Sequence, residues 1–399
     1  MKKILIVIND MGMGGAQRSL LSFLKCLHSS PQMAQYQVHI MVVDPAGGFY
    51  AQIPQGFTQL QPPKELHWLG TAFSKALLTR YFSVKCLLGE AKWLLKKRLG
   101  LFPKSWNVQQ KLWDCWKDRV PELPGHYDVA VSYIDGYPNY YVMDKVQADK
   151  KVLWVHNEYQ KLAYDPVYDR SFYEKAHSII TISPQCRQCI LQEYPALGEK
   201  VHILENITVP AEVLEKSRQG ECPEFAGFDG LKLLSVGRLN PQKGYDLAIE
   251  SAKILRDQGI SFLWLVLGEG PERQALQEQI DSNGLCDCFR LLGNRNNPYS
   301  YMAGCDILVQ SSRFEGKSVV LDEAKILCKP IVVTDYTTAK DAISHGVTGW
   351  ITPITAQGIG DGILKLYRDT ELRKRIVENL TALPKGNEAE LGKYLQNMF

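Results

Sequence analysis

The sequence predicts an α/β protein with two doubly wound parallel sheets, and three observations support this prediction. The chain has 399 residues, which is too long for one ordinary hydrophobic core and suits two domains. Short apolar runs alternate with helix-like segments, as in parallel sheets whose strands are joined by helices. A turn-rich stretch at 215–230, with Gly220, Pro223, Gly227 and Gly230, indicates a linker.

Strands are predicted where a short apolar run stands between turn residues. In the first half of the chain these runs are 3–8, 37–43, 128–133, 151–155 and 178–182, and in the second half 231–236, 262–267, 288–292, 306–310 and 330–334. The first run begins like a signal peptide, but it stops at Asn9 and is too short for one, so we predict a buried strand. A helix-like stretch, 388–398, follows Gly386.

Composition limits the classes of protein that the chain can form. Hydrophobic residues make up 45% of the sequence, which permits two full-sized cores. No apolar run approaches the roughly 18 residues of a membrane-spanning helix, so we expect no integral membrane protein. The 10 cysteines occur without a secretory signal, so a reducing compartment, the cytoplasm, is the expected location. Cys186 and Cys189 lack a second pair at zinc spacing, and we expect no metal site.

The segment 311–324 is the most informative part of the sequence for function. It follows the strand-like run 306–310, turns at Gly316 and continues as a helix-like run. The first turn of such a helix offers unpaired N–H groups and the positive end of the helix dipole, which favour a phosphate. Glu315 and Glu323 are eight residues apart, a step that returns to nearly the same helix face roughly 12 Å further on.

Carboxylates and cations at this edge together favour a nucleoside-diphosphate sugar. An ionised carboxylate only accepts hydrogen bonds, so Glu315 and Glu323 suit sugar and ribose hydroxyls. Solvated helix glutamates are the alternative for such a pair. Arg238 and Lys243 follow the strand-like run 231–236, where a guanidinium fork and an ammonium suit a diphosphate. Open α/β sheets bind ligands at the carboxyl ends of their strands.

Motifs in both halves of the chain resemble glycosyltransferase family 4, of the bacterial surface-polysaccharide type. In the second half they are Gly237-Arg238 with Lys243-Gly244, Leu267-Gly268-Glu269-Gly270-Pro271, and Phe314-Glu315-Gly316 through Glu323-Ala324; in the first half they are Gly14-Gly15-Ala16-Gln17-Arg18, Val155-His156-Asn157 and Asn206-Ile207-Thr208-Val209-Pro210. The resemblance covers nearly the whole chain except roughly 45–125.

The resemblance implies the GT-B fold, in which two Rossmann-like domains face a central cleft. The acceptor-side domain would be 1–212 and the nucleotide-sugar-binding domain 213–384, with the terminal helix in 385–399 crossing back to the first domain. It also implies a role for each matching residue. Arg238 and Lys243 would hold the donor diphosphate.

Glu323 would bind the ribose and Glu315 the donor sugar near the reacting carbon, while His156 would contact that sugar from the first domain. The other implied donor-binding positions are loop glycines and the helix start: Gly14, Gly15, Gly237, Gly316, Lys317, Ser318 and Val319. The pair Lys317-Ser318 stands where the family more usually has an apolar residue followed by Pro or Ser, so the sugar pocket departs from the family pattern.

The function implied is that of a retaining, metal-independent hexosyltransferase without a cofactor. It would move a sugar from a UDP- or GDP-linked donor to a hydroxyl of a lipid-linked or growing saccharide in surface polysaccharide or lipopolysaccharide biosynthesis. Two alternatives remain: a sugar-nucleotide epimerase of the same architecture and a non-catalytic saccharide-binding scaffold. An oxidoreductase is disfavoured because the first glycine-rich turn, 11–15, lacks G-x-G-x-x-G spacing.

Residues 71–119 form a basic, aromatic-rich insertion. They contain eleven Lys or Arg and three Asp or Glu, a balance of +8 in a chain of net charge +3, so the remainder carries 3 − 8 = −5. Because the remainder is acidic and no recognition motif appears, we expect no nucleic-acid partner. Four tryptophans also fall here: Trp93, Trp106, Trp113 and Trp116.

One helix within this insertion is predicted to carry an apolar seam at steps of three and four residues: Leu77, Tyr81, Val84, Leu88, Ala91 and Leu95. Basic residues flank the seam at Lys85, Lys92, Lys96, Lys97 and Arg98. Two interpretations stay open. The helix packs on its own domain, or it lies on an anionic membrane and makes the protein peripheral on the inner face of the plasma membrane.

Overall fold

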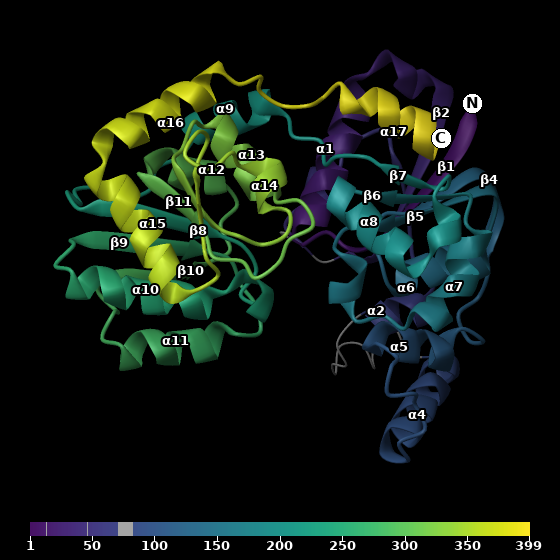
Figure 1. Cartoon of the computed structure of the whole chain (residues 1–399). Helices are drawn as coiled ribbons and strands as arrows, with labels where there is room; N and C mark the ends of the chain where they lie inside the picture. The colour runs from purple at the N-terminus through teal and green to yellow at the C-terminus, as the bar shows by residue number, and fades with distance from the viewer. Residues whose placement is uncertain (13, 46, 71–82) are drawn as a thin grey trace. The chain divides into compact units, whose positions relative to one another are not determined.

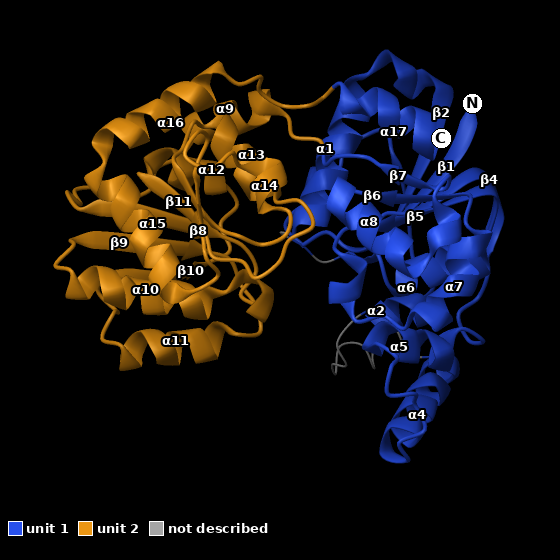
Figure 2. Ribbon diagram, viewed as in Figure 1, with its two compact units in different colours: residues 1–206, 389–399 blue, residues 207–388 orange. Residues whose placement is uncertain are grey.

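The computed structural model of the chain divides into two compact units (Figure 2). The structure describes residues 1–12, 14–45, 47–70 and 83–399. Unit 1 comprises Met1–Asn206 together with Ala389–Phe399, and unit 2 comprises Ile207–Glu388. Each unit contains one parallel sheet covered by helices (Figure 1), so the predicted α/β class is confirmed.

Unit 1 is built on a seven-stranded sheet with the order β3-β2-β1-β4-β5-β6-β7. Its strands are β1 (Lys2–Asp10), β2 (Tyr36–Asp44), β3 (Thr58–Leu60), β4 (Leu123–Ser132), β5 (Val146–Val155), β6 (Ser178–Thr181) and β7 (Val201–Ile203). Its helices are α1 (Gly15–Ser29), α2 (Lys64–Gly70), α4 (Val84–Arg98), α5 (Val108–Trp116), α6 (Tyr137–Lys145), α7 (Pro166–Lys175), α8 (Pro184–Glu193) and α17 (Glu390–Met398).

Unit 2 is built on a six-stranded sheet with the order β10-β9-β8-β11-β12-β13. Its strands are β8 (Leu231–Val236), β9 (Phe262–Leu267), β10 (Phe289–Gly293), β11 (Ile307–Gln310), β12 (Ile331–Thr334) and β13 (Trp350–Thr352). Its helices are α9 (Pro210–Arg218), α10 (Tyr245–Asp257), α11 (Arg273–Ser282), α12 (Pro298–Gly304), α13 (Val319–Ile326), α14 (Ala339–Ala342), α15 (Ala356–Arg368) and α16 (Thr370–Ala382).

The strands appear in the sequence as continuous apolar runs because both faces of each sheet are covered. In β8, Leu233 belongs to the core on one face of the sheet and the next residue, Leu234, to the core on the other face. Successive strand residues point to opposite faces, so a strand buried on both sides is apolar throughout. All six residues of β9 are buried for this reason.

The strand order reverses once in each sheet, and these reversals fix where a ligand can bind. In unit 1, β1 lies between β2 and β4, and in unit 2, β8 lies between β9 and β11. The loops that leave such neighbouring strands go to opposite faces of the sheet and leave a crevice at the carboxyl ends. The candidate site residues of unit 2 follow β8 and β11.

Three observed strands were not predicted, and all three lie at sheet edges. β3, β7 and β13 have three residues each and end the strand orders of their sheets. An edge strand is covered less than a central one, so it needs no continuous apolar run. β3 shows this directly, since Thr58 and Gln59 are exposed.

The boundary between the units falls at Asn206, before the predicted linker 215–230. That segment lies within unit 2, where α9 contacts α12 and α13 and the Phe225 side chain is buried. The turn residues in it therefore connect elements of one unit. The C-terminal helix α17 belongs to unit 1, where the buried Tyr394 ring stacks on Phe23 with ring centroids 5.0 Å apart.

Helix α4 packs on unit 1 through a face other than the predicted apolar seam. The seam residues Val84, Leu88, Ala91 and Leu95 are exposed, whereas Cys86 and Gly89 are buried; Leu77 and Tyr81 lie outside the described residues. Of the two interpretations left open, packing on its own domain is observed, but through the face that carries Cys86 and Gly89, because periodicity identifies an apolar stripe without identifying what covers it. No helix in the described part of the chain is both long and apolar enough to cross a bilayer.

Candidate active site

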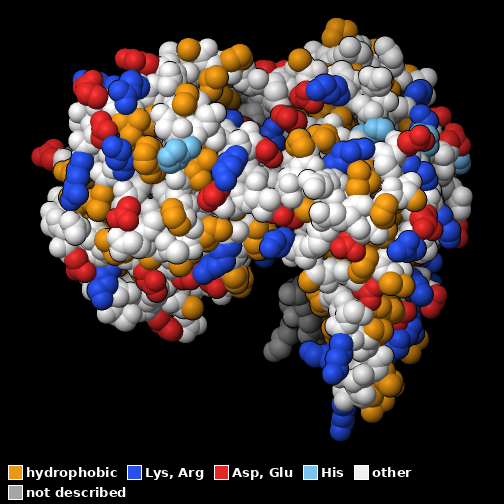
Figure 3. Space-filling model, viewed as in Figure 1, with side chains coloured by type: hydrophobic (Ala, Val, Ile, Leu, Met, Phe, Trp, Pro, Cys, Tyr) orange, Lys and Arg blue, Asp and Glu red, His pale blue; other side chains and the backbone are white. Residues whose placement is uncertain are grey.

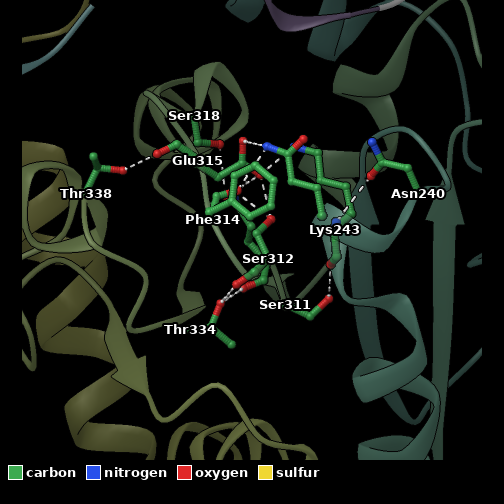
Figure 4. A network of polar contacts seen from close by, with 11 residues as sticks. Asn240, Lys243, Ser311, Ser312, Phe314, Glu315, Ser318, Thr334 and Thr338 are labelled. Atoms are coloured by element: carbon green, nitrogen blue, oxygen red, sulfur yellow. Dashed lines mark hydrogen bonds and ion pairs between the residues drawn. The ribbon is translucent and has the colours of Figure 1, made fainter. Parts of the chain in front are cut away.

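Three loops at the carboxyl ends of β8, β11 and β12 meet in unit 2 and hold one another by hydrogen bonds (Figure 4). The Ser311 hydroxyl donates to the Lys243 carbonyl at 2.8 Å, which ties the loop after β11 to the loop after β8. Thr334 Oγ1 donates to the Ser312 carbonyl at 2.5 Å, and Thr338 Oγ1 to the Glu315 carbonyl at 2.8 Å. Side chains from β12 and the loop after it thus fix the backbone around Glu315.

The Glu315 carboxylate lies at the centre of these loops, and the residue is only 7% exposed. Lys243 Nζ and Ser312 Oγ each lie 2.6 Å from its Oε1 atom. Gln310 Nε2 donates to the same oxygen at 3.2 Å, and Gln242 Nε2 donates to Oε2 at 3.4 Å. A buried carboxylate needs such donors, because an unpaired charge away from water is costly.

Two tyrosines beside this carboxylate are kept neutral. Burial raises the pKa of Tyr245 and of Tyr336, and the negative charge of Glu315 raises both further. A phenol that stays protonated can only donate its proton in a hydrogen bond or accept one at oxygen. Neither tyrosine therefore adds negative charge where an anionic ligand would bind.

The start of α13 is open to an acceptor because Ser318, at the N-cap position, forms no side-chain cap. Its hydroxyl donates instead to Gln310 Oε1 at 2.9 Å. The Gln310 amide therefore links the helix start to Glu315, since its nitrogen donates to that carboxylate. Uncapped N–H groups of a first helical turn, with the dipole behind them, suit an anion. Val319 is the first residue of this helix.

Glu323 lies in the second turn of α13, and the residue is 2% exposed. Tyr299 of α12 donates a hydrogen bond to its Oε1 atom at 2.9 Å. Glu315 precedes the helix, which begins only at Val319. The predicted helical step between the two glutamates is therefore wrong, because half of that interval is loop, although both carboxylates belong to the same β11–α13 connection.

Arg238 is exposed in the turn after β8, beside a second glycine-rich turn. The Leu239 N–H donates to the Glu269 carbonyl at 3.0 Å. A Cβ atom on Gly268 would collide with the Gly237 carbonyl, so only glycine allows the two turns to approach. The motif 267–271 thus supports the backbone that carries Arg238.

Gly14 and Gly15 stand where β1 ends and α1 begins, in unit 1. Gly14 is the N-cap of α1 and, lacking a side chain, leaves that helix start without a side-chain cap. Asp10 Oδ1 accepts from the Gly12 N–H at 2.7 Å and from Gln17 Nε2 at 3.1 Å, which fixes the loop.

His156 follows β5 at the same edge of the unit 1 sheet and is 7% exposed. Its Nε2 atom lies 2.9 Å from the Tyr133 carbonyl, which can only accept, so Nε2 carries the proton. The ring stacks on Trp154 with centroids 4.9 Å apart. Burial lowers the pKa of His156 to about 4. The neutral ring therefore leaves Nδ1 unprotonated, as a hydrogen-bond acceptor.

This burial predicts a pH dependence of stability. The folded-state pKa of His156 is about 4 and its ordinary value is 6.5, so below pH 6.5 the unfolded chain binds a proton that the folded chain does not. The free energy of unfolding should fall by about 3 kcal/mol between pH 7 and pH 4 from this group alone. Urea unfolding of wild type and His156→Gln across this range isolates the effect, because other titrations cancel. A pH-independent difference between the two proteins would contradict it.

Four residues of the site were not identified from the sequence: Gln242, Gln310, Ser312 and Tyr299. The first three hold Glu315, and the fourth holds Glu323. Gln242 stands next to Lys243, and Ser312 lies within the segment singled out, but neither residue type indicates a ligand. The predicted residues of unit 2 form two groups. One lies on the β11–α13 connection, and Lys243 joins it by pairing with Glu315; the other is the Gly237-Arg238 turn after β8. Gly14, Gly15 and His156 belong to the unit 1 sheet.

Comparison with known proteins extends this description. Residues 227–382, which lie within unit 2, match the family model Glycosyl transferases group 1. An alpha-D-kanosaminyltransferase from Streptomyces kanamyceticus is 27% identical over 222 residues, which are 54% of this chain and 58% of the relative. An N-acetylgalactosamine-N,N'-diacetylbacillosaminyl-diphospho-undecaprenol 4-alpha-N-acetylgalactosaminyltransferase from Campylobacter jejuni is 31% identical over 205 residues, 51% of this chain and 54% of the relative. The chain spans about half the length of the curated relatives it matches.

A solved structure shows that the similarity in fold covers both units. Anabaena Alr3699/HepE, solved in complex with UDP and glucose, has a TM-score of 0.67 and 18% identity, covering 99% of this chain and 98% of that one. At this level of identity, the similarity is one of fold. Both units are parallel-sheet α/β domains, and their structural neighbours are GT-B glycosyltransferases, so the predicted fold is confirmed.

Proposed function

We propose that the protein is a retaining glycosyltransferase that moves a hexosyl unit from a UDP- or GDP-linked sugar to an acceptor hydroxyl. The observation that carries the proposal is the uncapped start of α13 beside the partly buried Lys243–Glu315 pair, at the strand reversal of unit 2. The family match of unit 2 and the printed activities of the relatives support it. UDP bound to a protein of the same fold supports the donor class.

The difficult part of this reaction is the charge of the leaving group. As the bond between the sugar C1 atom and the phosphate oxygen breaks, negative charge grows on the diphosphate, and preorganised cations and N–H groups stabilise it. Arg238, Lys243 and the start of α13 supply that stabilisation. The Lys243 ammonium has three N–H donors and uses one on Glu315, so it can contact a phosphate as well.

Glu315 would bind the donor sugar and stabilise the positive charge that develops on its ring. The hydrogen bonds from Ser312, Gln310 and Gln242 fix the carboxylate in place and lower its nucleophilicity. We therefore assign it a positioning and electrostatic role and no covalent intermediate. Glu323 would bind the ribose, and neutral His156 would accept a hydrogen bond from a donor-sugar hydroxyl.

Retention follows if the acceptor approaches on the face that the diphosphate leaves. The acceptor oxygen forms the new bond to C1, its proton passes to the departing phosphate oxygen, and the old C–O bond breaks. No separate base and no bound metal are required, because the leaving group takes the proton and the protein supplies the positive charge.

The proposed acceptor is a lipid-linked or growing saccharide in surface polysaccharide or lipopolysaccharide biosynthesis. One relative acts, by its name, on a diphospho-undecaprenol-linked sugar, and another, from Rhizobium meliloti, is named a lipopolysaccharide core biosynthesis glycosyltransferase. A lipid-linked acceptor would bring a cytoplasmic enzyme to the inner face of the plasma membrane.

Calorimetric titration with UDP, GDP, ADP, their common sugar conjugates and NAD tests the donor site. We expect one nucleoside diphosphate to bind, and Arg238→Ala to weaken it by about 10- to 100-fold, as expected for the loss of a charge-assisted contact. Arg290→Ala is the matched control, because Arg290 is exposed on β10 in the same unit. Absence of binding by every nucleotide would favour the scaffold alternative, and binding of NAD alone an oxidoreductase.

Analysis of the sugar product separates transfer from epimerisation. A glycosyltransferase releases the nucleoside diphosphate and joins the sugar to the acceptor, whereas an epimerase acts on the donor sugar without needing an acceptor. Retention predicts that the new glycosidic bond has the anomeric configuration of the donor.

A further inference from the structure

Exposed hydrophobic side chains concentrate on one short segment of unit 1. Of the 14 large hydrophobic side chains that are exposed among the described residues, seven lie within 84–101. They are Val84, Leu87, Leu88, Leu94, Leu95, Leu99 and Leu101, with exposed fractions between 41% and 64%. Single exposed hydrophobics are normal, but a contiguous group marks an interaction surface.

Five of these side chains form one face of α4, which we call the α4 ridge: Val84, Leu87, Leu88, Leu94 and Leu95. At 100° per residue they span an arc of about 120°. The buried residues Cys86 and Gly89 lie on the opposite side of the helix. The ridge therefore faces away from the rest of unit 1, from which α4 projects (Figure 1).

The opposite face of α4 is fixed to α5, so the ridge cannot turn inward without breaking specific contacts. Gly89 lies so close to the Trp116 ring that a Cβ atom there would be 2.8 Å from ring carbons. Lys96 pairs with the Asp114 carboxylate at 2.7 Å, and Lys92 donates to the Asp114 carbonyl at 2.9 Å. The sequence makes α4 amphipathic, and these contacts decide which side meets solvent.

The ridge is surrounded by positive charge. Residues 83–104 contain six cations and one acid, Glu90, a balance of 6 − 1 = +5. Lys85, Lys97, Arg98 and Lys104 are exposed and form no ion pair with any described residue. Hydrophobic and basic side chains share the projecting part of unit 1 that α4 forms (Figure 3).

We propose that the α4 ridge is the surface by which the protein docks on an anionic lipid bilayer. An amphipathic helix with apolar side chains on one face and lysines at its flanks lies in the headgroup region, burying the apolar face while the cations meet lipid phosphates. The positive charge around the ridge favours an anionic bilayer over an apolar protein surface. An apolar partner would leave four unpaired cations at the edge of the interface. The inference rests on the exposed face of α4 and holds whatever the donor sugar is.

Vesicle flotation with the full-length chain tests the proposal. Wild type should float with vesicles that contain phosphatidylglycerol, bind phosphatidylcholine vesicles at least about 10-fold more weakly, and dissociate as salt is raised. The double variant Leu88→Asp/Leu95→Asp should bind anionic vesicles about 100-fold more weakly, because it removes two apolar contacts and adds repulsion. Lys85→Gln/Lys97→Gln/Arg98→Gln should lose binding to anionic vesicles to a similar extent.

The matched control is Val167→Asp/Val347→Asp, which makes the same kind of change at exposed apolar positions outside the ridge. It should bind vesicles as wild type does. Wild type that stays unbound, or a ridge variant that binds as well as wild type, would overturn the proposal. A dimer that depends on Leu88 and Leu95, seen by light scattering without vesicle binding, would assign the ridge to a second copy and also overturn it. The Leu88→Asp/Leu95→Asp variant should bind nucleotide as wild type does. Failure of the membrane proposal can therefore be distinguished from failure of the proposed donor site.

Discussion

Replacing Glu315 by glutamine is expected to lower the turnover number by about 10²- to 10³-fold with the nucleotide sugar that calorimetry identifies. Glutamine keeps the size of the side chain and can still accept hydrogen bonds from Lys243 and Ser312, which now contact Oε1. It removes the negative charge that would stabilise a positively charged sugar ring. The melting temperature should change by no more than about 3 °C, because side-chain volume is conserved and the partner left unpaired, Lys243, is the more exposed of the two at 19%.

Two measurements make this result specific. Release of the nucleoside diphosphate reports turnover, and circular dichroism reports folding of the same preparation. Gln242→Ala provides a comparison, since it removes a 3.4 Å contact to Glu315 and a 3.0 Å hydrogen bond to the Phe314 carbonyl, and it should reduce turnover by roughly 10-fold or less. Near-wild-type turnover in Glu315→Gln would contradict the site assignment.

Replacing Lys243 by methionine is expected to lower both activity and stability. The structure places this pair in a largely buried setting, with the Lys243 and Glu315 side chains 19% and 8% exposed. Removing one partner leaves a buried carboxylate, which should cost about 3 kcal/mol of unfolding free energy. Loss of a cation that faces the leaving diphosphate should reduce turnover by about 10³-fold.

The double variant Lys243→Met/Glu315→Gln separates these two effects. It removes both charges, so urea unfolding should recover most of the lost stability, while turnover stays as low as in the single variants. The control is Arg313→Met, which breaks the 2.6 Å ion pair between Arg313, on the same loop as Glu315, and Asp246 of α10. Those side chains are 37% and 40% exposed, so the cost should be below about 1 kcal/mol. A double variant no more stable than Lys243→Met would show that the pair is not the source of the loss.

Some features of the candidate site are indicated by the local sequence, and others arise only from contacts between residues far apart in the chain. The turn after β8 and the connection after β11 were identified from glycines and charged residues next to apolar runs. The contacts of Glu315 with Gln242 and Lys243 join residues 73 and 72 positions apart. No local sequence pattern predicts such a role for a glutamine. Its partner is determined only when the neighbouring strands β8 and β11 bring the two loops together.

The sequence alone determined the α/β class and the central strands, because a strand covered on both faces must be apolar throughout; β8 and β9 begin and end where the apolar runs do. It also located the cations and carboxylates at strand ends, since glycine turns and charged residues are local signals. Only the tertiary structure decided the edge strands, the residues that hold Glu315 and the face of α4 that meets solvent. Periodicity defines a stripe on a helix, but the fit of Trp116 against Gly89 decides which side of α4 is covered.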